Sequence, residues 1–252
     1  AKVIFLQDLW IEYYGAMQIS GVLKKHGHST SILFDNEENT VQEIKKSKPD
    51  LICYSLMSMQ WPWAKSMSSF IKKSGIDTPQ IVGGIHATMT PELTIEHEGI
   101  DMICKGEGEF ALLDLCEAID KKNDYSNIQN LWVKKGNDII KNPIRPKLTP
   151  EGLTALPFPD RELYTKYKYF KNYPFVTFVG SRGCPFKCSF CEVPDITNLS
   201  GTGKSTVYQN VDSFIDEIYE LKKTGFLKGK LLMFTDSTFN SNKKWFLEFC
   251  EK

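Results

Sequence analysis

The sequence predicts an α/β protein in two parts, a doubly wound parallel sheet followed by the opening of a βα barrel. Three observations support this prediction. Short apolar runs alternate with amphipathic helical patterns over residues 1–122, which is typical of a parallel sheet covered on both faces. A proline-rich stretch then interrupts the alternation. Strand and helix patterns resume from Phe175.

The first part contains five strand-like runs separated by helical patterns. The first run, residues 3–7, precedes apolar residues at helical spacing between Ala16 and Leu23. The other predicted strands are 29–34, 50–56, 80–83 and 102–105, and the other predicted helices are 40–46, 63–73, 91–96 and 110–121. Lys-Lys-x-Gly recurs at 24–27, 72–75 and 222–225. It predicts three helix ends, because lysines oppose the helix dipole and glycine adopts the left-handed conformation.

Residues that directly follow a strand are the candidate ligand contacts, because parallel sheets of this class bind ligands beyond the carboxyl ends of their strands. Ser55-Leu56-Met57 ends the third predicted strand, and Gly83-Gly84-Ile85-His86 ends the fourth. A glycine pair at a strand end lets a ligand approach the backbone closely. No Gly-x-Gly-x-x-Gly follows the first strand, which argues against a dinucleotide.

Composition limits the partners that we expect. The 31 basic residues balance the 31 acidic ones, so no overall charge attracts nucleic acid or an anionic membrane, and a small-molecule substrate is favoured. The chain opens directly into a strand-like run, without signal-peptide features, and no apolar segment approaches the length of a membrane span. We therefore expect no membrane partner and a reducing, cytoplasmic location that keeps thiols available.

Residues 123–174 differ in character from what precedes them. A hairpin pattern occupies 131–140, and prolines at 143, 146, 150, 157 and 159 keep the following chain extended. The predicted organisation is a ligand-binding domain at 1–122, a hairpin and proline-rich linker at 123–174, and the barrel segment at 175–252.

The barrel segment begins with a predicted strand at 175–180. A helix is expected at 211–223 with Asn210 as its N-cap, and a further strand at 230–235 ends before Asp236. A closed barrel needs about 30 residues for each of its units, so these residues hold two units and the start of a third. We expect a fragment of a longer protein, or a partial barrel completed by something else.

Three cysteines, Cys184, Cys188 and Cys191, fall within eight residues of the loop after this strand. Three thiolates can hold three irons of a 4Fe-4S cubane and leave the fourth iron open to another ligand. A zinc site is less favoured, because it needs a fourth ligand and all four histidines lie far upstream. A disulfide framework is opposed by the odd number of cysteines, seven.

The Cys-x3-Cys-x2-Cys spacing, with the aromatic Phe190 directly before the last cysteine, resembles the motif of the radical S-adenosylmethionine (SAM) enzymes. The resemblance implies a 4Fe-4S cluster on the three cysteines, with SAM chelated at the open iron and cleaved reductively to a 5′-deoxyadenosyl radical. It also implies that Phe190 lies against the adenine and that Asp236 binds the SAM ammonium. On spacing alone, a turn or N-cap role for Asp236 is equally open.

The first part is similar to cobalamin-binding domains in its second and third motifs. Ser55 and Met57 correspond to Ser-x-Leu, and Gly83-Gly84 matches the glycine pair. Residues 8–15 contain no histidine, so the usual cobalt ligand is absent. This departure is typical of the cobalamin-dependent radical SAM family, including the anaerobic magnesium-protoporphyrin monomethyl ester cyclases and radical SAM methyltransferases.

Further segments resemble the same family: residues 83–88, 106–109 and 156–161. The resemblance implies a Rossmann-like cobalamin-binding domain, with His86 among the residues near cobalamin. A structural, hydrogen-bonded histidine is the other interpretation of His86. Glu107 and Glu109 open a helix, where the dipole favours negative charge whatever the function.

The function that this resemblance implies is methyl transfer to an unactivated carbon or phosphorus of a small molecule. The cofactors would be the 4Fe-4S cluster, SAM and cobalamin, with an electron donor such as flavodoxin or ferredoxin. Three alternatives stay open: an oxidative cyclase of the anaerobic magnesium-protoporphyrin ester type, a non-catalytic cobalamin and iron–sulfur sensor, and a radical enzyme without cobalamin.

Residues 201–206, Gly-Thr-Gly-Lys-Ser-Thr, are similar to a nucleotide-binding P-loop. In the P-loop pattern the first glycine would fall at Asn198, and no predicted strand precedes it. We therefore do not expect nucleotide hydrolysis.

Overall fold

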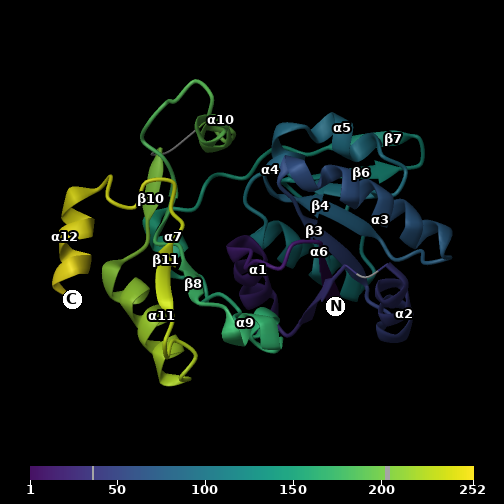
Figure 1. Ribbon diagram of the computed structural model, residues 1–252. Coiled ribbons are helices and arrows are strands. Elements are labelled where there is room, and N and C mark those ends of the chain that lie inside the picture. The colour runs from purple at the N-terminus through teal and green to yellow at the C-terminus, as the bar shows by residue number, and fades with distance from the viewer. Residues whose placement is uncertain (36, 202–204) are drawn as a thin grey trace. The chain divides into compact units, whose positions relative to one another are not determined.

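The computed structural model describes residues 1–35, 37–201 and 205–252. These residues form two compact units, Ala1–Arg145 and Pro146–Lys252. Each unit is described by itself, and Figure 1 labels its helices and strands. The P-loop-like stretch has residues 202–204 outside the described ranges.

The first unit is built on a seven-stranded sheet in the order β2-β1-β3-β4-β5-β6-β7. Its strands are β1 (Lys2–Gln7), β2 (Ser29–Phe34), β3 (Leu51–Ser55), β4 (Gln80–Gly83), β5 (Met102–Cys104), β6 (Leu131–Lys135) and β7 (Asp138–Lys141). The first five strands pair in parallel, whereas β6 and β7 are antiparallel. The five predicted parallel strands are confirmed.

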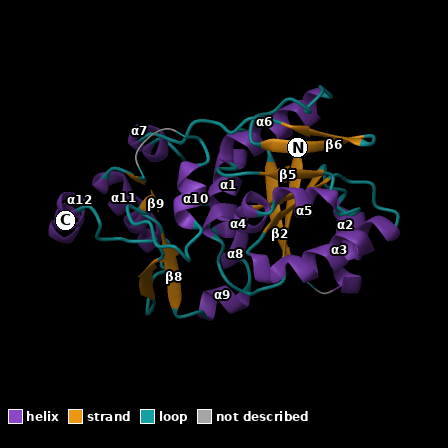
Figure 2. Cartoon of the chain, turned by 90° about the horizontal axis from the view of Figure 1, so that it is seen from above, coloured by secondary structure: helices purple, strands orange, loops and turns teal. Residues whose placement is uncertain are grey.

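Helices lie on both faces of this sheet (Figures 1 and 2). They are α1 (Tyr14–Lys25), α2 (Glu37–Ser47), the short 3-10 helix η1 (Ser58–Gln60), α3 (Trp61–Lys73), α4 (Gly84–Met89), α5 (Pro91–Glu96) and α6 (Glu109–Lys121). Helices α1 and α6 pack against each other. Helices α2, α3, α4 and α5 contribute to the core on the other face. The doubly wound arrangement is therefore as predicted.

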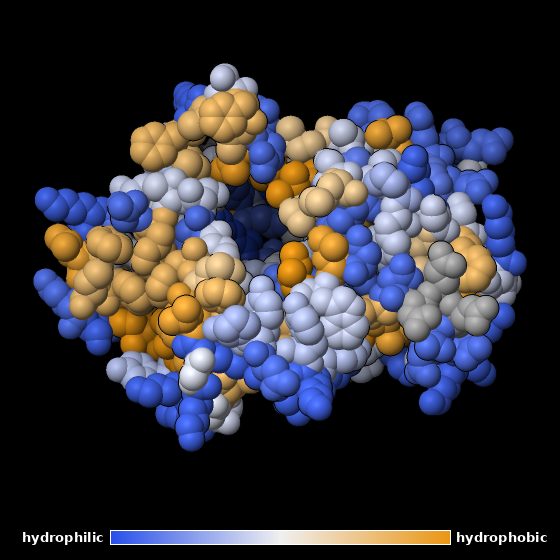
Figure 3. Space-filling model, in the orientation of Figure 1, coloured by the Kyte–Doolittle hydropathy of each residue, from blue (hydrophilic) through white to orange (hydrophobic). Residues whose placement is uncertain are grey.

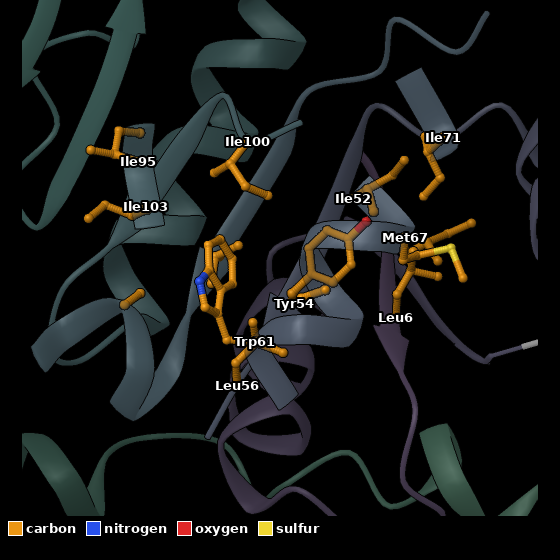
Figure 4. Close-up of a cluster of buried hydrophobic side chains, with 14 of the residues drawn as sticks. Leu6, Ile52, Tyr54, Leu56, Trp61, Met67, Ile71, Ile95, Ile100 and Ile103 are labelled. Atoms are coloured by element: carbon orange, nitrogen blue, oxygen red, sulfur yellow. The ribbon is translucent and has the colours of Figure 1, made fainter. Parts of the chain in front are cut away.

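A hydrophobic core lies between the sheet and α3, and it includes residues near the carboxyl ends of the central strands. Ile52 and Tyr54 of β3 point to the same face because strand side chains alternate. Trp61 of α3 lies beside Ile100 and Ile103 in this cluster (Figure 4). The Tyr54 hydroxyl donates to Gln80 Oε1 at 2.5 Å, which satisfies a polar group buried among apolar side chains.

Three helices end at the Lys-Lys-x-Gly sequences, as predicted. Helices α1, α3 and α11 (Val211–Lys223) each carry two lysines in the last turn. The glycines that follow, Gly27, Gly75 and Gly225, all have positive φ. Such angles are accessible to glycine at no steric cost, so the pattern identified real helix ends.

The hairpin expected in the linker belongs to the first unit instead. Strand β6 pairs with β5, so the hairpin β6–β7 extends the sheet at its β5 edge. Trp132 is buried in the main core of the unit. The boundary between the units consequently lies between Arg145 and Pro146, which differs from the predicted linker at 123–174. A hairpin pattern shows how two strands pair with each other and not which sheet they join.

The second unit contains two βα units. Its elements are α7 (Pro150–Thr154), α8 (Glu162–Thr165), α9 (Lys168–Asn172), β8 (Phe175–Phe178), β9 (Ser181–Gly183), α10 (Val193–Asn198), β10 (Thr206–Tyr208), α11, β11 (Leu231–Phe234) and α12 (Lys243–Glu251). Strands β8 and β11 pair in parallel, with α11 in the crossover between them. Strands β9 and β10 form a separate antiparallel pair. Asn210 caps α11 by accepting from the N–H groups of Asp212 and Ser213, as predicted.

Aromatic side chains dominate the core of the second unit. Phe178 of β8, Phe214 of α11 and Trp245 of α12 are buried together. By contrast, the side chains of β11 are open, and Leu231 is 64% exposed. Figure 3 shows hydrophobic side chains at the surface over the part of this unit that carries α11, β11 and α12. The second unit therefore leaves apolar strand residues uncovered, whereas the central strands of the first unit are buried on both faces.

Candidate functional site

The first candidate site lies at the carboxyl end of the sheet in the first unit. Strand order reverses between β1 and β3, and this is where open α/β sheets bind ligands. The segments after β1, β3 and β4 expose the hydrophobic side chains of Trp10, Met59 and Ile85, and Met59 is 75% exposed. Large apolar side chains on neighbouring loops form a surface suited to a large, partly apolar ligand.

Hydrogen bonds between these loops hold the surface in place. The Gln60 amide donates to Asp8 Oδ1 and accepts from the Met57 N–H at 3.1 Å. The Gln7 amide donates to the Ile11 carbonyl at 2.7 Å. Burial, reinforced by the charge of Asp8, raises the pKa of Tyr13 to about 12, so this phenol stays protonated at neutral pH. The binding surface is thus pre-formed by polar contacts.

The predicted residues of two motifs meet in this site. Ser55 of β3 and Gly83 of β4 are register partners, and Met57 follows in the loop after β3. At Gly84, φ is +86° and a Cβ would lie 2.8 Å from the backbone N and O of Leu56. At Gly83 a Cβ would meet nothing closer than 3.8 Å. Gly84 is therefore required by the fold itself, whereas a Cβ at Gly83 would make only ordinary contacts with Cys104 and Tyr54.

His86 is buried rather than presented to solvent, with 3% of its surface exposed. Its Nδ1 lies 3.1 Å from Ser58 Oγ, and the Thr90 hydroxyl lies 3.4 Å from its Nε2. Its ring also packs against Trp61 with centroids 4.9 Å apart. Burial, and then the charge of Lys65, lowers the pKa of His86. These contacts support a role in positioning the loop after β3.

A second pair of motifs is also adjacent in the structure. The Gly106 N–H donates to Thr88 Oγ1 at 3.0 Å, which joins residues 83–88 to residues 106–109. Asn130 Nδ2 donates to the Glu107 carbonyl at 2.7 Å. Glu109 is buried at the start of α6. Sequence reasoning identified these segments and placed Ile85 among the residues that follow the fourth strand, but it missed Met59 because a single exposed apolar residue carries no pattern.

The second candidate site is the cysteine loop of the second unit, which follows β9. Cys184 and Cys191 are half-buried, Cys188 is exposed, and all three are free thiols. The Cys191 N–H donates to the Cys188 carbonyl at 3.1 Å, which closes a turn between the last two cysteines. Phe190 is 91% exposed at the loop surface. An exposed aromatic beside three thiols is an arrangement that a bound cofactor could cover.

Gly183 fixes the start of this loop. Its φ is +83°, and a Cβ there would lie 2.1 Å from the Ser205 carbonyl oxygen. Within residues 1–35, 37–201 and 205–252, no three His, Cys, Asp or Glu side chains are grouped as ligands of one metal ion. A cubane needs a different arrangement, because each of its irons takes its own thiolate. The three free thiols of one loop provide the donor set that such a cluster requires.

Asp236 lies at the end of β11, near the strand that leads to the cysteine loop. Its carboxylate accepts from Ser181 Oγ at 2.5 Å and from the Gly180 N–H at 3.1 Å. Burial raises the pKa of Asp236, although these hydrogen bonds oppose the shift. Asp236 thus anchors the approach to the loop, and this contact does not exclude a second partner because each carboxylate oxygen has two acceptor sites.

Comparison with known proteins assigns the first unit. The family model described as B12 binding domain matches residues 11–115. Most of the first unit therefore matches a B12-binding domain. Met59, Gly83 and Ile85 lie within the matched residues, and Trp10 directly precedes them.

The chain also resembles longer proteins over most of its own length. An uncharacterized methyltransferase of Pyrococcus horikoshii is 30% identical, over 80% of this chain and 42% of that protein. An anaerobic magnesium-protoporphyrin IX monomethyl ester cyclase of Rubrivivax gelatinosus is 26% identical, over 96% of this chain and 43% of the cyclase. The chain thus spans less than half the length of these relatives.

Among solved structures, the radical SAM methyltransferase TsrM of Kitasatospora setae superposes with a TM-score of 0.77 and 20% identity, covering 99% of this chain and 50% of TsrM. This likeness confirms the predicted fold, a Rossmann-like cobalamin-binding domain followed by the start of a radical SAM barrel. The resemblance to cobalamin-dependent radical SAM enzymes is likewise confirmed. In the part of the chain that the structure describes, no helix is both long and apolar enough to cross a bilayer.

Proposed function

We propose that this chain is part of a cobalamin-dependent radical SAM enzyme that transfers a methyl group to an unactivated carbon or phosphorus of a small molecule. One observation carries the proposal: three free cysteines at Cys-x3-Cys-x2-Cys spacing share one exposed loop, in a chain that also contains a B12-binding domain. The names of relatives such as the Pyrococcus horikoshii methyltransferase support methyl transfer.

In this proposal each residue has a defined task. The thiolates of Cys184, Cys188 and Cys191 hold three irons of a 4Fe-4S cluster and leave one iron for SAM. Phe190 covers the adenine, and Asp236 lies where it can accept from the SAM ammonium. When bound, the cluster supplies the electron that cleaves SAM, and cobalamin carries the methyl group.

The B12-binding domain has its own tasks. The missing side chain at Gly83 lets cobalamin approach the backbone at the end of β4, beside its register partner Ser55 and the following Met57. His86 holds the loop after β3 through Ser58. The hydrophobic side chains at the edge of the sheet cover the cofactor and keep water away from it. An electron donor such as flavodoxin or ferredoxin, and a cytoplasmic location, belong to the same proposal.

The cysteine assignment is tested by Cys188→Ala, made in the full-length protein and reconstituted anaerobically with iron, sulfide and cobalamin. We expect the variant to lose cluster assembly and the release of 5′-deoxyadenosine from SAM together, while cobalamin uptake persists. Cys250→Ala is the matched control, because Cys250 is also exposed but lies on α12. SAM cleavage at the wild-type rate in Cys188→Ala would overturn the ligand assignment.

Oxidative cyclisation is the second candidate reaction, because the Rubrivivax gelatinosus cyclase aligns with 96% of this chain. Anaerobic product analysis separates the two reactions: methyl transfer gives a product heavier by one methylene group, whereas oxidative cyclisation gives a new ring without added carbon. A sensor without catalytic activity would release no 5′-deoxyadenosine on reduction. A radical enzyme without cobalamin would release it but bind no cobalamin.

A further inference from the structure

The turn after β11 reaches the first cysteine of the loop directly. Thr238 Oγ1 lies 3.3 Å from Cys184 Sγ, although the two residues are 54 positions apart in the chain. This distance is within hydrogen-bond range for sulfur. The contact joins two segments that follow neighbouring parallel strands, β8 and β11. No motif in the sequence marks Thr238.

The surrounding hydrogen bonds hold Thr238 in this position. The Tyr208 hydroxyl donates to the Thr238 carbonyl at 3.4 Å and lies 2.5 Å from Ser241 Oγ. The Asn242 N–H donates to the same tyrosine oxygen at 3.2 Å. At the other end of the turn, Asp236 is anchored to Gly180 and Ser181. The threonine hydroxyl therefore faces the sulfur from a segment fixed on both sides.

The number of protons available determines whether Thr238 Oγ1 or Cys184 Sγ donates the hydrogen bond between them once iron is bound. The Thr238 hydroxyl has one proton, and in this structure that proton can be donated to the Ser237 carbonyl at 2.7 Å. A thiol at Cys184 can then donate to Thr238 Oγ1. An iron-bound sulfur carries no proton, so only the threonine hydroxyl can donate across the 3.3 Å contact.

We propose that Thr238 is a positioning residue whose hydroxyl donates a hydrogen bond to the iron-bound sulfur of Cys184 and raises the reduction potential of the cluster. Hydrogen bonds to the cysteine sulfurs are among the determinants of that potential. Reduction adds negative charge to the cluster and its thiolates, so a donor at the sulfur stabilises the reduced state more than the oxidised state. This inference rests on the proposed function, because it requires a 4Fe-4S cluster at Cys184.

The test compares Thr238→Val, which keeps the shape of the side chain, with Thr238→Ser, which keeps the hydroxyl. Ser237→Ala is the matched control, because it removes the neighbouring hydroxyl from an exposed residue. Each full-length protein is reconstituted with iron and sulfide and titrated electrochemically with detection by electron paramagnetic resonance. We expect Thr238→Val to make reduction about tenfold less favourable, a negative shift of about 59 mV for a one-electron couple. The other two variants keep the wild-type potential.

Resonance Raman spectroscopy gives a second readout that a purely structural role would not change. A hydrogen bond weakens the terminal iron–sulfur bond, so Thr238→Val should raise one Fe–S(Cys) stretching frequency while Thr238→Ser does not. Thr238→Ala serves as a second variant if valine prevents cluster assembly. Unchanged potential and frequencies in clustered Thr238→Val or Thr238→Ala would overturn the inference while leaving the proposed function intact. A wild-type protein that binds no iron would overturn both.

Discussion

Two adjacent glycines, Gly83 at the end of β4 and Gly84 directly after it, differ in what their positions require. Gly84 has positive φ and would place a Cβ against the backbone of Leu56, so the fold alone explains it. Gly83 has an extended backbone, with φ of −125°, and a Cβ there would make only ordinary contacts, at 3.8 Å from Cys104 and 3.9 Å from Tyr54. The fold alone therefore does not require glycine at Gly83.

Gly83→Val tests cobalamin binding, because a Cβ at this position makes only ordinary contacts, at 3.8 Å or more, within the fold. We expect cobalamin affinity to fall at least about tenfold, which is about 1.4 kcal/mol, while the Tm stays near the wild-type value. Gly84→Ala should instead lower the Tm by several degrees, because the backbone is strained and crowded there. Equilibrium binding of hydroxocobalamin and thermal unfolding measure the two effects. Wild-type affinity in Gly83→Val would remove Gly83 from the binding site.

The lowered pKa of His86 predicts a pH dependence of stability. Burial, followed by the charge of Lys65, disfavours the charged imidazole in the folded state, so the unfolded state binds the proton more readily. The contribution of His86 is fully present above its ordinary pKa of 6.5 and declines as pH falls from there toward the folded pKa. Titration of the His86 ring by NMR should give a midpoint below 6.5. A midpoint at or above 6.5 would contradict the buried, neutral histidine.

Functional residues that belong to a short sequence motif could be predicted from the sequence. Residues whose role depends on a contact with a distant part of the chain could not. The cysteine spacing and the glycine pair are readable within a few positions. The hydrogen bond from Gln60 to Asp8 spans 52 residues, and it exists only because β1 and β3 are neighbours in the sheet. The contact between Thr238 and Cys184 likewise depends on the pairing of β8 with β11.

At the scale of the elements, a buried ion pair attaches the proline-rich segment before α8 to helix α11. Arg161 precedes α8 and donates to Glu217 of α11 at 2.8 Å, and the side chains are only 9% and 5% exposed. The Arg161 guanidinium also lies 4.7 Å from the ring centroid of Phe178 in β8. The proline-rich segment was predicted to be a linker. Its Arg161 packs on both a helix, α11, and a strand, β8.

Removing one partner of this pair should destabilise the second unit strongly. Glu217→Leu leaves the guanidinium buried without its carboxylate, and we expect a loss of about 3–5 kcal/mol in the free energy of unfolding. The double variant Arg161→Met with Glu217→Leu should recover much of that loss. Glu220→Ala is the control, because its pair with Lys223 is exposed and should not measurably affect stability. Urea denaturation distinguishes these cases. If the single and double variants were equally stable, the Arg161 guanidinium in Glu217→Leu would not be an unpaired buried charge, which would contradict this prediction.

Several elements, short ones among them, have the bounds that the sequence predicted, whereas others were missed or placed incompletely. The strands β2 and β4 and the helices α5 and α11 have the predicted bounds. Helix α4 was missed, because Gly84 begins it and residues 83–86 were interpreted only as candidate ligand contacts. The hairpin β6–β7 was recognised as a hairpin, but its place beside β5 depends on tertiary packing.

For the whole molecule, the order of units follows from sequence patterning. Alternating strands and helices predicted the doubly wound unit, and the later return of this pattern predicted the βα units of the second. Substrate choice does not follow from such patterning, because it depends on a few individual side chains. The relatives are more than twice as long as the aligned segment.

The most direct test of the central claim is Mössbauer spectroscopy of the full-length protein reconstituted with iron-57, recorded with and without SAM. If three cysteines leave one iron open, SAM should change the isomer shift of one iron in four and leave the other three unchanged. Four equivalent irons that do not respond to SAM, or zinc at these thiols in place of a cluster, would contradict the account.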